Sequence, residues 1–285
     1  KLAVNNENFR KSIVHAFNRM PALATSDRID PESLKNNTIT PNAFASASKD
    51  YTYYEGLAAY TDGDNFDKAL AEEYKAAAID ELTAAGATFP IKMLMCYNPT
   101  SANWAQECQV VEQQIETVLG ADYVDIIIQA GPETGFLGAI RRTGNYAFMK
   151  CNWGADYADP ETWTDPFSAD SSYSFIFKST DPETQALYAE YTELVAAAKA
   201  ITDDMDARYT AFAKAEAFLL DHAFAVPFSI SNRSYQMCNL NVFEGQYASF
   251  GVANQRYKDQ HLYSSSMGME EYQAAYAEWQ SKKAG

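Results

Sequence analysis

Residues 153–160 combine the side-chain types that a ligand-binding loop needs. They read Trp-Gly-Ala-Asp-Tyr-Ala-Asp-Pro and directly follow a predicted strand over residues 146–152. Asp156 offers a carboxylate, which is a strong charge-assisted acceptor for an ammonium group. Trp153 and Tyr157 flank it with amphipathic rings. Ligand contacts concentrate on loops that a rigid scaffold holds, so this pattern predicts a binding loop.

The same residue types also have structural explanations, which the sequence leaves open. Asp156 could cap the following turn through its own side chain, and Trp153 could belong to the core. Lys150, three residues before Trp153, could lie solvated at the strand end. Asp159 before Pro160 favours an extended or turn conformation and is expected to shape the loop.

Metal and catalytic motifs are weak in this chain. The three histidines are scattered, without metal-ligand spacing, and we expect His15 to be a packing residue on a helix. Asp62, Asp64 and Glu73 have the spacing of positions 1, 3 and 12 of a calcium loop, but a helix N-terminus with favourable acids explains them better. No nucleophile or phosphate-loop motif occurs, and we predict neither a metal nor a cofactor.

The cysteines also argue against a metal site. Cys96, Cys108, Cys151 and Cys238 form no C-x-x-C pair, which disfavours zinc. Packing as small apolar side chains is the default expectation, with disulfide pairing left open.

Length, composition and net charge restrict the class of protein. The 285 residues can bury one large or two modest domains, and 47% of them are hydrophobic. A formal charge of −16 disfavours nucleic acid and anionic lipid as partners. No apolar run is long enough for a membrane span, and the start of the sequence has no basic segment followed by an apolar one, so we expect neither a membrane helix nor a signal peptide in these residues. Because the chain opens at Lys1 with no Met, we expect it to be part of a longer precursor.

Hydrophobic periodicity and turn residues predict an α/β fold. The pattern alternates strand, helix, strand, helix and strand between residues 91 and 152, which implies parallel strands joined by crossovers. Asn103 suits a capping box for the helix at 104–119, Pro21 ends or turns the first helix, and Gly86 ends the second. The expected helices cover 8–19, 65–85, 104–119, 133–142, 182–200, 205–222 and 270–283, and the expected strands cover 91–96, 123–129, 146–152 and 224–230.

Several of these segments resemble family 5 extracellular solute-binding proteins, the oligopeptide- and dipeptide-binding components of ABC importers. Residues 9–19, FRKSIVHAFNR, resemble the family's V-R-K-A-I-x-x-A-I-D-R segment. Residues 76–86, AAAIDELTAAG, are similar to its A-x-x-L-L-x-x-A-G helix end. The next strand, helix and strand follow in the family's order, and the 153–160 loop matches its W-x-x-D-Y-x-D/E-P turn. The resemblance covers roughly residues 1–230.

The resemblance implies a type II periplasmic-binding fold, of which residues 1–223 form the second ligand-binding lobe. Residues 224–285 are then a segment that returns towards the first lobe. The family's pattern implies that Asp156 pairs with the α-amino group of a peptide, that Trp153 and Tyr157 line the cleft, and that Lys150 faces the peptide's carboxylate. The implied mechanism is lobe closure around the ligand and recognition by the membrane permease, outside the cytoplasm and with a lipid anchor.

Two other functions remain open at this stage. The same fold could bind a sugar, a nickel complex or another small solute. An acid-pair hydrolase is the alternative from another class. A chain that carries one lobe is also expected to expose apolar surface and to self-associate.

Overall fold

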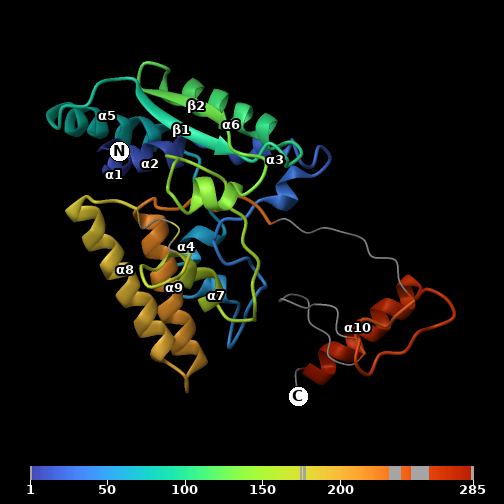
Figure 1. The fold of residues 1–285 in the computed structure, drawn as a ribbon. Coiled ribbons are helices and arrows are strands. Elements are labelled where there is room, and N and C mark those ends of the chain that lie inside the picture. Colours follow the sequence, from blue (N-terminus) through green and yellow to red (C-terminus); the bar gives the residue numbers. More distant parts are fainter. Residues whose placement is uncertain (1, 174, 176–177, 231–238, 245–256, 284–285) are drawn as a thin grey trace. The chain divides into compact units, whose positions relative to one another are not determined.

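A computed structural model of the chain describes residues 2–173, 175, 178–230, 239–244 and 257–283 (Figure 1). Their contacts group into two compact units, of which the first contains Lys1–Asn152 and Asp159–Ile230. The second contains Trp153–Ala158 and Ser231–Gly285. We predicted that residues 1–223 form the second ligand-binding lobe and that residues 224–285 return towards the first lobe. This division stays a prediction.

Two parallel strands, β1 (Ile91–Tyr97) and β2 (Val124–Ala130), form the sheet of the first unit. They pair in register from Ile91 with Val124 to Tyr97 with Ala130. Helix α6 (Trp104–Leu119) is the crossover that connects them. Parallel strands need such a connection because a tight turn cannot reverse the chain between them.

Helices α2 (Glu7–Ala16), α5 (Lys68–Ala84) and α6 pack with this sheet around one apolar core (Figure 1). The Asn6 side chain caps α2 by accepting a hydrogen bond of 2.7 Å from the amide of Phe9. Asp67 caps α5 in the same way. The core of this layer includes Phe9, Ile13, Leu82, Met93, Ile115 and Val124.

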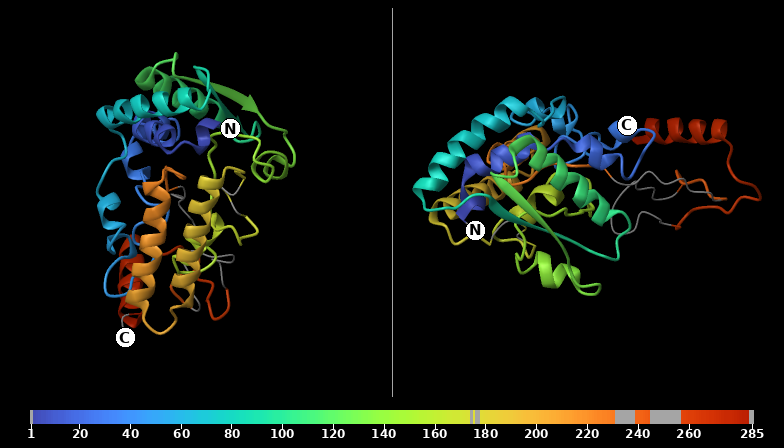
Figure 2. Two further views of the ribbon diagram at one scale, coloured as in Figure 1. Left: turned by 90° about the vertical axis from the view of Figure 1, so that its left-hand side faces the viewer. Right: turned by 90° about the horizontal axis from the view of Figure 1, so that it is seen from above.

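A second apolar core lies around two long helices of the first unit, α8 (Pro182–Ala200) and α9 (Met205–Asp221). They run side by side in Figures 1 and 2 and begin at the capping residues Asp181 and Asp204. Helices α4 (Ala58–Thr61) and α7 (Glu161–Thr164) belong to the same region. The buried side chains of this core include Tyr51, Leu57, Tyr191, Tyr209, Phe212 and Leu219.

The remaining elements of the first unit are short. They are α1 (Leu2–Asn5), α3 (Arg19–Leu23), a π-helical turn Leu137–Arg141, and 3₁₀ turns at Pro31–Leu34, Tyr51–Tyr53 and Asp165–Phe167.

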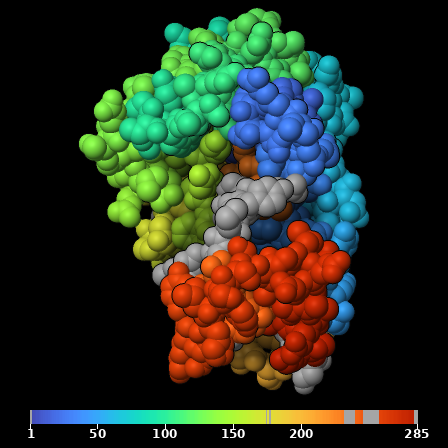
Figure 3. All heavy atoms as spheres, turned by 90° about the vertical axis from the view of Figure 1, so that its right-hand side faces the viewer, coloured from blue at the N-terminus to red at the C-terminus, as the bar shows by residue number. Residues whose placement is uncertain are grey.

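The second unit contains helix α10 (Met269–Lys283), whose atoms are among those drawn in red in Figure 3. Phe243 lies against Tyr272, Tyr276 and Trp279 of this helix, with ring centroids 5.1 to 5.9 Å apart. Glu244 accepts hydrogen bonds from the His261 amide and the Tyr263 hydroxyl. An aromatic cluster therefore packs Phe243 against α10.

The strand and helix predictions for 91–96, 104–119, 123–129, 182–200, 205–222 and 270–283 are confirmed to within a residue or two. The predicted helix at 65–85 is also present, as Lys68–Ala84. Gly86 follows it with a φ of +82°, a conformation that glycine adopts without steric cost.

Two predicted strands are wrong. Residues 146–152 form only a single bridge between Phe148 and Met95, because the chain turns away beyond it. Residues 224–230 are almost all apolar, yet only Ser229 forms a bridge, with Lys35. Pro227 lacks an amide donor, which further disfavours strand pairing there. The predicted βαβαβ run is therefore a βαβ unit with a third segment beside it.

Three local predictions about helices are also wrong. The helix expected at 8–19 ends at Ala16, and Asn18 caps the new helix α3, which contains Pro21 in its first turn. Proline is tolerated there because the first amides of a helix have no partner within the helix. Asn103 adopts a φ of +63° and makes no side-chain cap bond, so the capping box is absent. The helix expected at 133–142 is reduced to the π-helical turn.

The fully buried carboxyl group of Glu216 connects α9 to the segment around residues 39–51. Glu216 accepts hydrogen bonds from the amides of Ile39 and Thr40, at 2.7 and 3.0 Å, and from the hydroxyls of Thr40 and Tyr51, at 2.7 and 3.1 Å. Burial raises the pKa of Glu216 to about 7, although these hydrogen bonds act in the opposite direction.

This carboxyl predicts a pH dependence of stability. Its pKa in the folded protein lies above the ordinary value of 4.5, so its stabilising contribution is complete below about pH 4.5 and is lost as the pH rises through 7. One pKa unit corresponds to about 1.4 kcal/mol, so the loss by pH 8 is about 3 kcal/mol. Urea unfolding from pH 5 to pH 8 should show this decline, and Glu216→Gln should flatten it.

The matched control is Glu190→Gln, which changes an exposed glutamate on the neighbouring helix α8. It should leave the pH profile as in the unchanged protein. An identical slope in Glu216→Gln and Glu190→Gln would show that the buried carboxyl does not titrate with folding.

Candidate functional site

The 153–160 loop presents Asp156 and Tyr157 to solvent, while Trp153 is half-buried. Tyr157 keeps 48% of its surface exposed, a large fraction for an aromatic side chain. The role of this loop in binding a ligand stays a prediction. The first six residues of the loop belong to the second compact unit, whereas Asp159 and Pro160 belong to the first.

On the N-terminal side of the loop, Lys150 forms an ion pair with Glu107 in the first turn of α6. Its Nζ lies 2.6 Å from Oε1 and 2.8 Å from Oε2 of Glu107. The Glu107 side chain is 7% exposed and that of Lys150 is 28% exposed. The ammonium also lies 5.3 Å from the centre of the Trp104 ring, a cation–π distance. Lys150 is therefore not a solvated strand-end residue.

At the other end of the loop, Asp159 forms a bidentate ion pair with Arg208 of α9. Arg208 Nε donates to Oδ2 at 2.9 Å, and Nη2 donates to Oδ1 at 3.0 Å. Asp159 Oδ1 also accepts from the amide of Glu161 at 2.9 Å, at the start of α7. The expectation that Asp159 shapes the end of the loop is confirmed.

Arg208 has further partners, so that each nitrogen of its guanidinium donates. Nη2 donates to Glu161 at 2.7 Å, and Nη1 donates to the carbonyls of Ala198, Lys199 and Ile201 at 3.1 to 3.3 Å. These carbonyls lie at the C-terminal end of α8, where a helix leaves its last acceptors without partners. The hydrogen bond with Asp159 raises the pKa of Arg208, which keeps its charge at every relevant pH.

The structure thus assigns the predicted site residues to two groups. Trp153, Asp156 and Tyr157 share one short segment of the second unit, and Lys150 lies in the first unit, two residues before that segment begins. Their roles towards a ligand stay predictions.

Two residues that support the loop were missed from the sequence. Glu107 shares a helix face with Val111, and Arg208 shares one with Phe212, so each places a charge beside apolar side chains. A charged residue on such a stripe needs a partner when it is buried. That signal could have marked both residues, although it could not have identified Lys150 and Asp159 as the partners.

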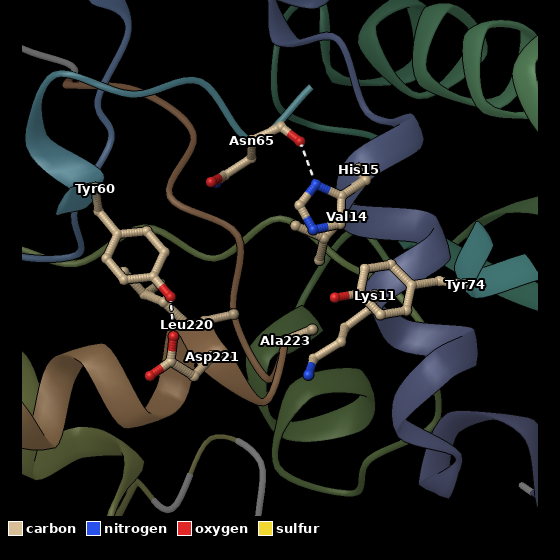
Figure 4. Close-up of a pocket in the computed structure, with 10 residues that line it drawn as sticks. Lys11, Val14, His15, Tyr60, Asn65, Tyr74, Leu220, Asp221 and Ala223 are labelled. Carbon is tan, nitrogen blue, oxygen red and sulfur yellow. Dashed lines mark hydrogen bonds between the residues drawn. The ribbon is translucent and has the colours of Figure 1, made fainter. Parts of the chain in front are cut away.

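A cavity of about 320 Å³ lies in the first unit, between α2, α5 and the end of α9 (Figure 4). His15 donates from Nδ1 to the Asn65 carbonyl at 2.7 Å, and the Tyr60 hydroxyl donates to Asp221. Lys11 pairs with Glu7 at 2.5 Å. The charged groups of its wall therefore already have protein partners, and the cavity carries no group that demands a ligand.

The remaining candidate residues are structural. His15 stacks on Tyr74 as a packing residue, which confirms the expectation. Of the acids with calcium-like spacing, Asp64 pairs with Arg19 and Lys35, and Asp62 accepts a hydrogen bond of 3.3 Å from the Tyr53 hydroxyl. The N-terminal cap of α5 is Asp67. Within the described residues, no group of three or more His, Cys, Asp or Glu side chains could hold a metal ion.

The cysteines divide by burial. Cys96 and Cys108 are buried, Cys151 is exposed, and none of these three forms a disulfide. Packing as a small apolar side chain is therefore confirmed for Cys96 and Cys108 and is wrong for Cys151. Cys238 lies outside the described residues. Among the helices that the structure describes, none is both long enough and apolar enough to span a membrane.

The parallel βαβ unit, its covering helices and the loop that follows define an α/β lobe of the type II periplasmic-binding class. The family model described as "Bacterial extracellular solute-binding proteins, family 5 Middle" matches residues 1–175. The chain belongs to this family of extracellular solute-binding proteins. Its relatives are solute-binding proteins and not enzymes.

Two curated relatives come from Streptococcus pneumoniae serotype 4. The oligopeptide-binding protein AmiA is 28% identical over 316 residues, which cover 100% of this chain and 48% of AmiA. The oligopeptide-binding protein AliA is 29% identical and is matched over 99% of this chain and 48% of its own length. The chain thus spans about half the length of the curated relatives that it matches.

Solved structures share the fold at lower sequence identity. The substrate-binding domain of an oligopeptide ABC transporter from Bacillus anthracis aligns with a TM-score of 0.67 at 21% identity, over 91% of this chain and 46% of that one. The pheromone receptor PrgZ aligns with a TM-score of 0.64 at 20% identity, over 90% of this chain and 45% of PrgZ.

The Lys150–Glu107 pair predicts that removing only the cation destabilises the protein more than removing both charges. Lys150→Met leaves the Glu107 carboxylate buried without its cation and should lower the free energy of unfolding by about 2 kcal/mol, less than for a fully buried pair because Lys150 is partly solvated. Adding Glu107→Gln removes the unpaired charge and should restore part of the loss. Urea unfolding of the single and double variants measures this, and a double variant less stable than Lys150→Met would contradict it.

Proposed function

We propose that the chain is the peptide-contacting lobe of an extracytoplasmic binding protein that delivers oligopeptides to an ABC importer. Family membership over residues 1–175 supports a solute-binding role. The named relatives AmiA and AliA are oligopeptide-binding proteins, which supports peptides as the class of solute.

The observation that carries the proposal is that exposed Asp156 lies in one short segment with half-buried Trp153 and exposed Tyr157. A peptide's free α-amino group is a cation that such a carboxylate can bind through charge-assisted hydrogen bonds. The rings exclude water from the ion pair and pack against the first side chains of the peptide. Water exclusion strengthens the interaction because charges attract more strongly at low dielectric.

Lys150 is proposed to contact the carboxylate of the peptide. An ammonium has three donors, and the two contacts with Glu107 use two of them. The pairing with Glu107 holds the ammonium in place with its third donor available to a ligand. Less side-chain entropy is then lost when the ligand binds.

The whole protein would bind by closing a second lobe over the ligand, and its closed form would then engage the membrane permease. It would act outside the cytoplasm, anchored to the cell surface by lipid, and without catalysis. A chain of this length on its own is proposed to self-associate through the apolar surface that meets the other lobe.

The role of Asp156 predicts a loss that depends on the amino terminus of the ligand. In the full-length gene product, Asp156→Asn should weaken the binding of peptides with a free amino terminus by roughly ten- to hundredfold, since hydrogen bonds to charged groups contribute about 1.5–3 kcal/mol. N-acetylated versions of the same peptides should bind the variant and the unchanged protein with equal affinity. Isothermal titration calorimetry provides both affinities.

Ala155→Ser, one position away in the same loop, is the matched control and should leave the difference between free and acetylated peptides intact. Thermal stabilisation by sugars alone, or turnover of a glycoside, would contradict peptide binding altogether.

The role of Lys150 predicts the complementary dependence on the carboxyl terminus. Lys150→Gln should weaken the binding of peptides with a free carboxylate by about tenfold and leave carboxyl-amidated peptides unaffected. Equal losses for both peptide classes would assign Lys150 to the support of the loop alone.

A further inference from the structure

The ammonium group of Lys150 lies among groups that are typical of binding sites for organic cations. Its Nζ contacts both carboxylate oxygens of Glu107, at 2.6 and 2.8 Å. It also lies 5.3 Å from the centre of the Trp104 ring and 5.9 Å from the centre of the Phe228 ring. A carboxylate and aromatic faces at such distances attract an alkylammonium ion. Trp104, Glu107 and Phe228 therefore form a cation cage.

The cation cage and Lys150 all belong to the first unit. Trp104 and Glu107 are three residues apart in the first turn of α6, so both side chains lie on one face of that helix. Phe228 comes from the segment that follows α9, next to Ser229, which bridges to Lys35. Two distant parts of the chain thus build the cage around a residue that belongs to neither of them.

The rings of the cage are held by aromatic partners of their own. The Trp104 ring meets the edge of buried Phe136 at a centroid distance of 5.4 Å. The Phe228 ring stacks on buried Phe17 at 5.9 Å, with an angle of 20° between the planes. Because these contacts do not involve Lys150, the cage is expected to keep its shape when the ammonium is removed.

Glu107 gives the cage its preference for a cation. Its side chain is only 7% exposed, so the carboxylate has lost most of its hydration and needs a partner. The first turn of α6 favours the negative form, since the helix dipole is positive at that end. A cage without Lys150 would therefore contain a charged carboxylate between two ring faces.

We propose that Lys150 is a specificity-determining residue, which fills a cation-binding cage and so makes this part of the binding site reject cationic groups. The cage fits a primary alkylammonium ion, and the ammonium of Lys150 occupies it in the unchanged protein. A free amine competes poorly with it, because a tethered group acts at a high effective concentration. The consequence for peptides rests on the proposed function, whereas the cage can be tested with small amines alone.

The first experiment empties the cage and refills it. Lys150→Ala removes the side chain beyond Cβ, and n-propylammonium supplies the same atoms as a free ion. In the full-length gene product, the amine at roughly ten times its Kd should raise the Tm of Lys150→Ala by about 3 °C relative to sodium chloride of equal ionic strength. The unchanged protein should show no such shift. Differential scanning fluorimetry at neutral pH measures both.

Failure of the variant to fold would still give a clear result. Lys150→Ala that does not fold alone should be recovered in folded form when it is refolded with n-propylammonium, and not when it is refolded with sodium chloride. Neither a rise in Tm nor a recovery of folded protein would overturn the cage.

The exposed pair of Lys214 with Glu55 provides the matched control. Its side chains are 51% and 78% exposed and the two charged groups are 3.3 Å apart. Lys214→Ala also leaves a carboxylate without its cation, but that carboxylate is in water, so n-propylammonium should not stabilise this variant. Equal shifts in Lys150→Ala and Lys214→Ala would contradict a specific site.

Two further variants separate the contributions of the cage residues. Adding Glu107→Gln to Lys150→Ala should abolish the effect of the amine, because the unpaired charge is gone. Adding Trp104→Leu instead should weaken the binding of n-propylammonium by about three- to tenfold, since one ring face is lost. An unchanged affinity in either double variant would show that the cage does not bind the amine.

The second experiment measures the charge preference of peptide binding. Peptides of one sequence end either in a free carboxylate or in an aminoethylamide, which carries an ammonium group. The unchanged protein should bind the carboxylate form about tenfold more tightly, and Lys150→Ala should reverse this preference. Isothermal titration calorimetry of the full-length gene product provides the affinities.

The two experiments distinguish the cage from the proposed contact of Lys150 with a peptide. Stabilisation of Lys150→Ala by n-propylammonium without a reversed peptide preference would support the cage and overturn its role in specificity. A carboxylate preference that is lost in Lys150→Ala, without any response to the amine, would refute the cage and leave the proposed peptide contact supported.

Discussion

The buried charges on α9 are the constraint around which much of the first unit is organised. Arg208, Phe212 and Glu216 lie at intervals of four residues and therefore share one face of the helix. Removing a charge from water is costly unless hydrogen-bond partners replace the lost hydration. Each of the two charged side chains consequently collects partners from loops that are distant in the sequence.

The two charges produce different outcomes because their chemistry differs. Arg208 stays charged and collects acceptors, namely carboxylates at 159 and 161 and the last carbonyls of α8. Glu216 collects donors from Ile39, Thr40 and Tyr51, and its raised pKa makes that contact dependent on pH. One helix thus holds Asp159 at one position and the loop at Ile39 and Thr40 two turns further on.

The same principle explains the contacts of two residues that flank residues 153–158 in the chain. Lys150 and Asp159, both in the first unit, pair with Glu107 of α6 and Arg208 of α9. These charged groups are largely removed from water, so each needs a partner of opposite charge.

The sequence by itself determined the helices and strands with strong periodicity, such as 104–119 and 182–200, because an apolar stripe and local capping residues are enough to specify them. It also determined the family and the loop that carries Asp156, since both depend on residue order. The tertiary structure decided the fate of residues 146–152 and 224–230, whose strand-like patterns found no neighbouring strand to pair with. It alone decided that Lys150 meets Glu107 and that Asp159 meets Arg208, because these partners are 43 and 49 residues apart in the chain. Ion pairs over such separations follow from how the helices pack, and no local pattern encodes them.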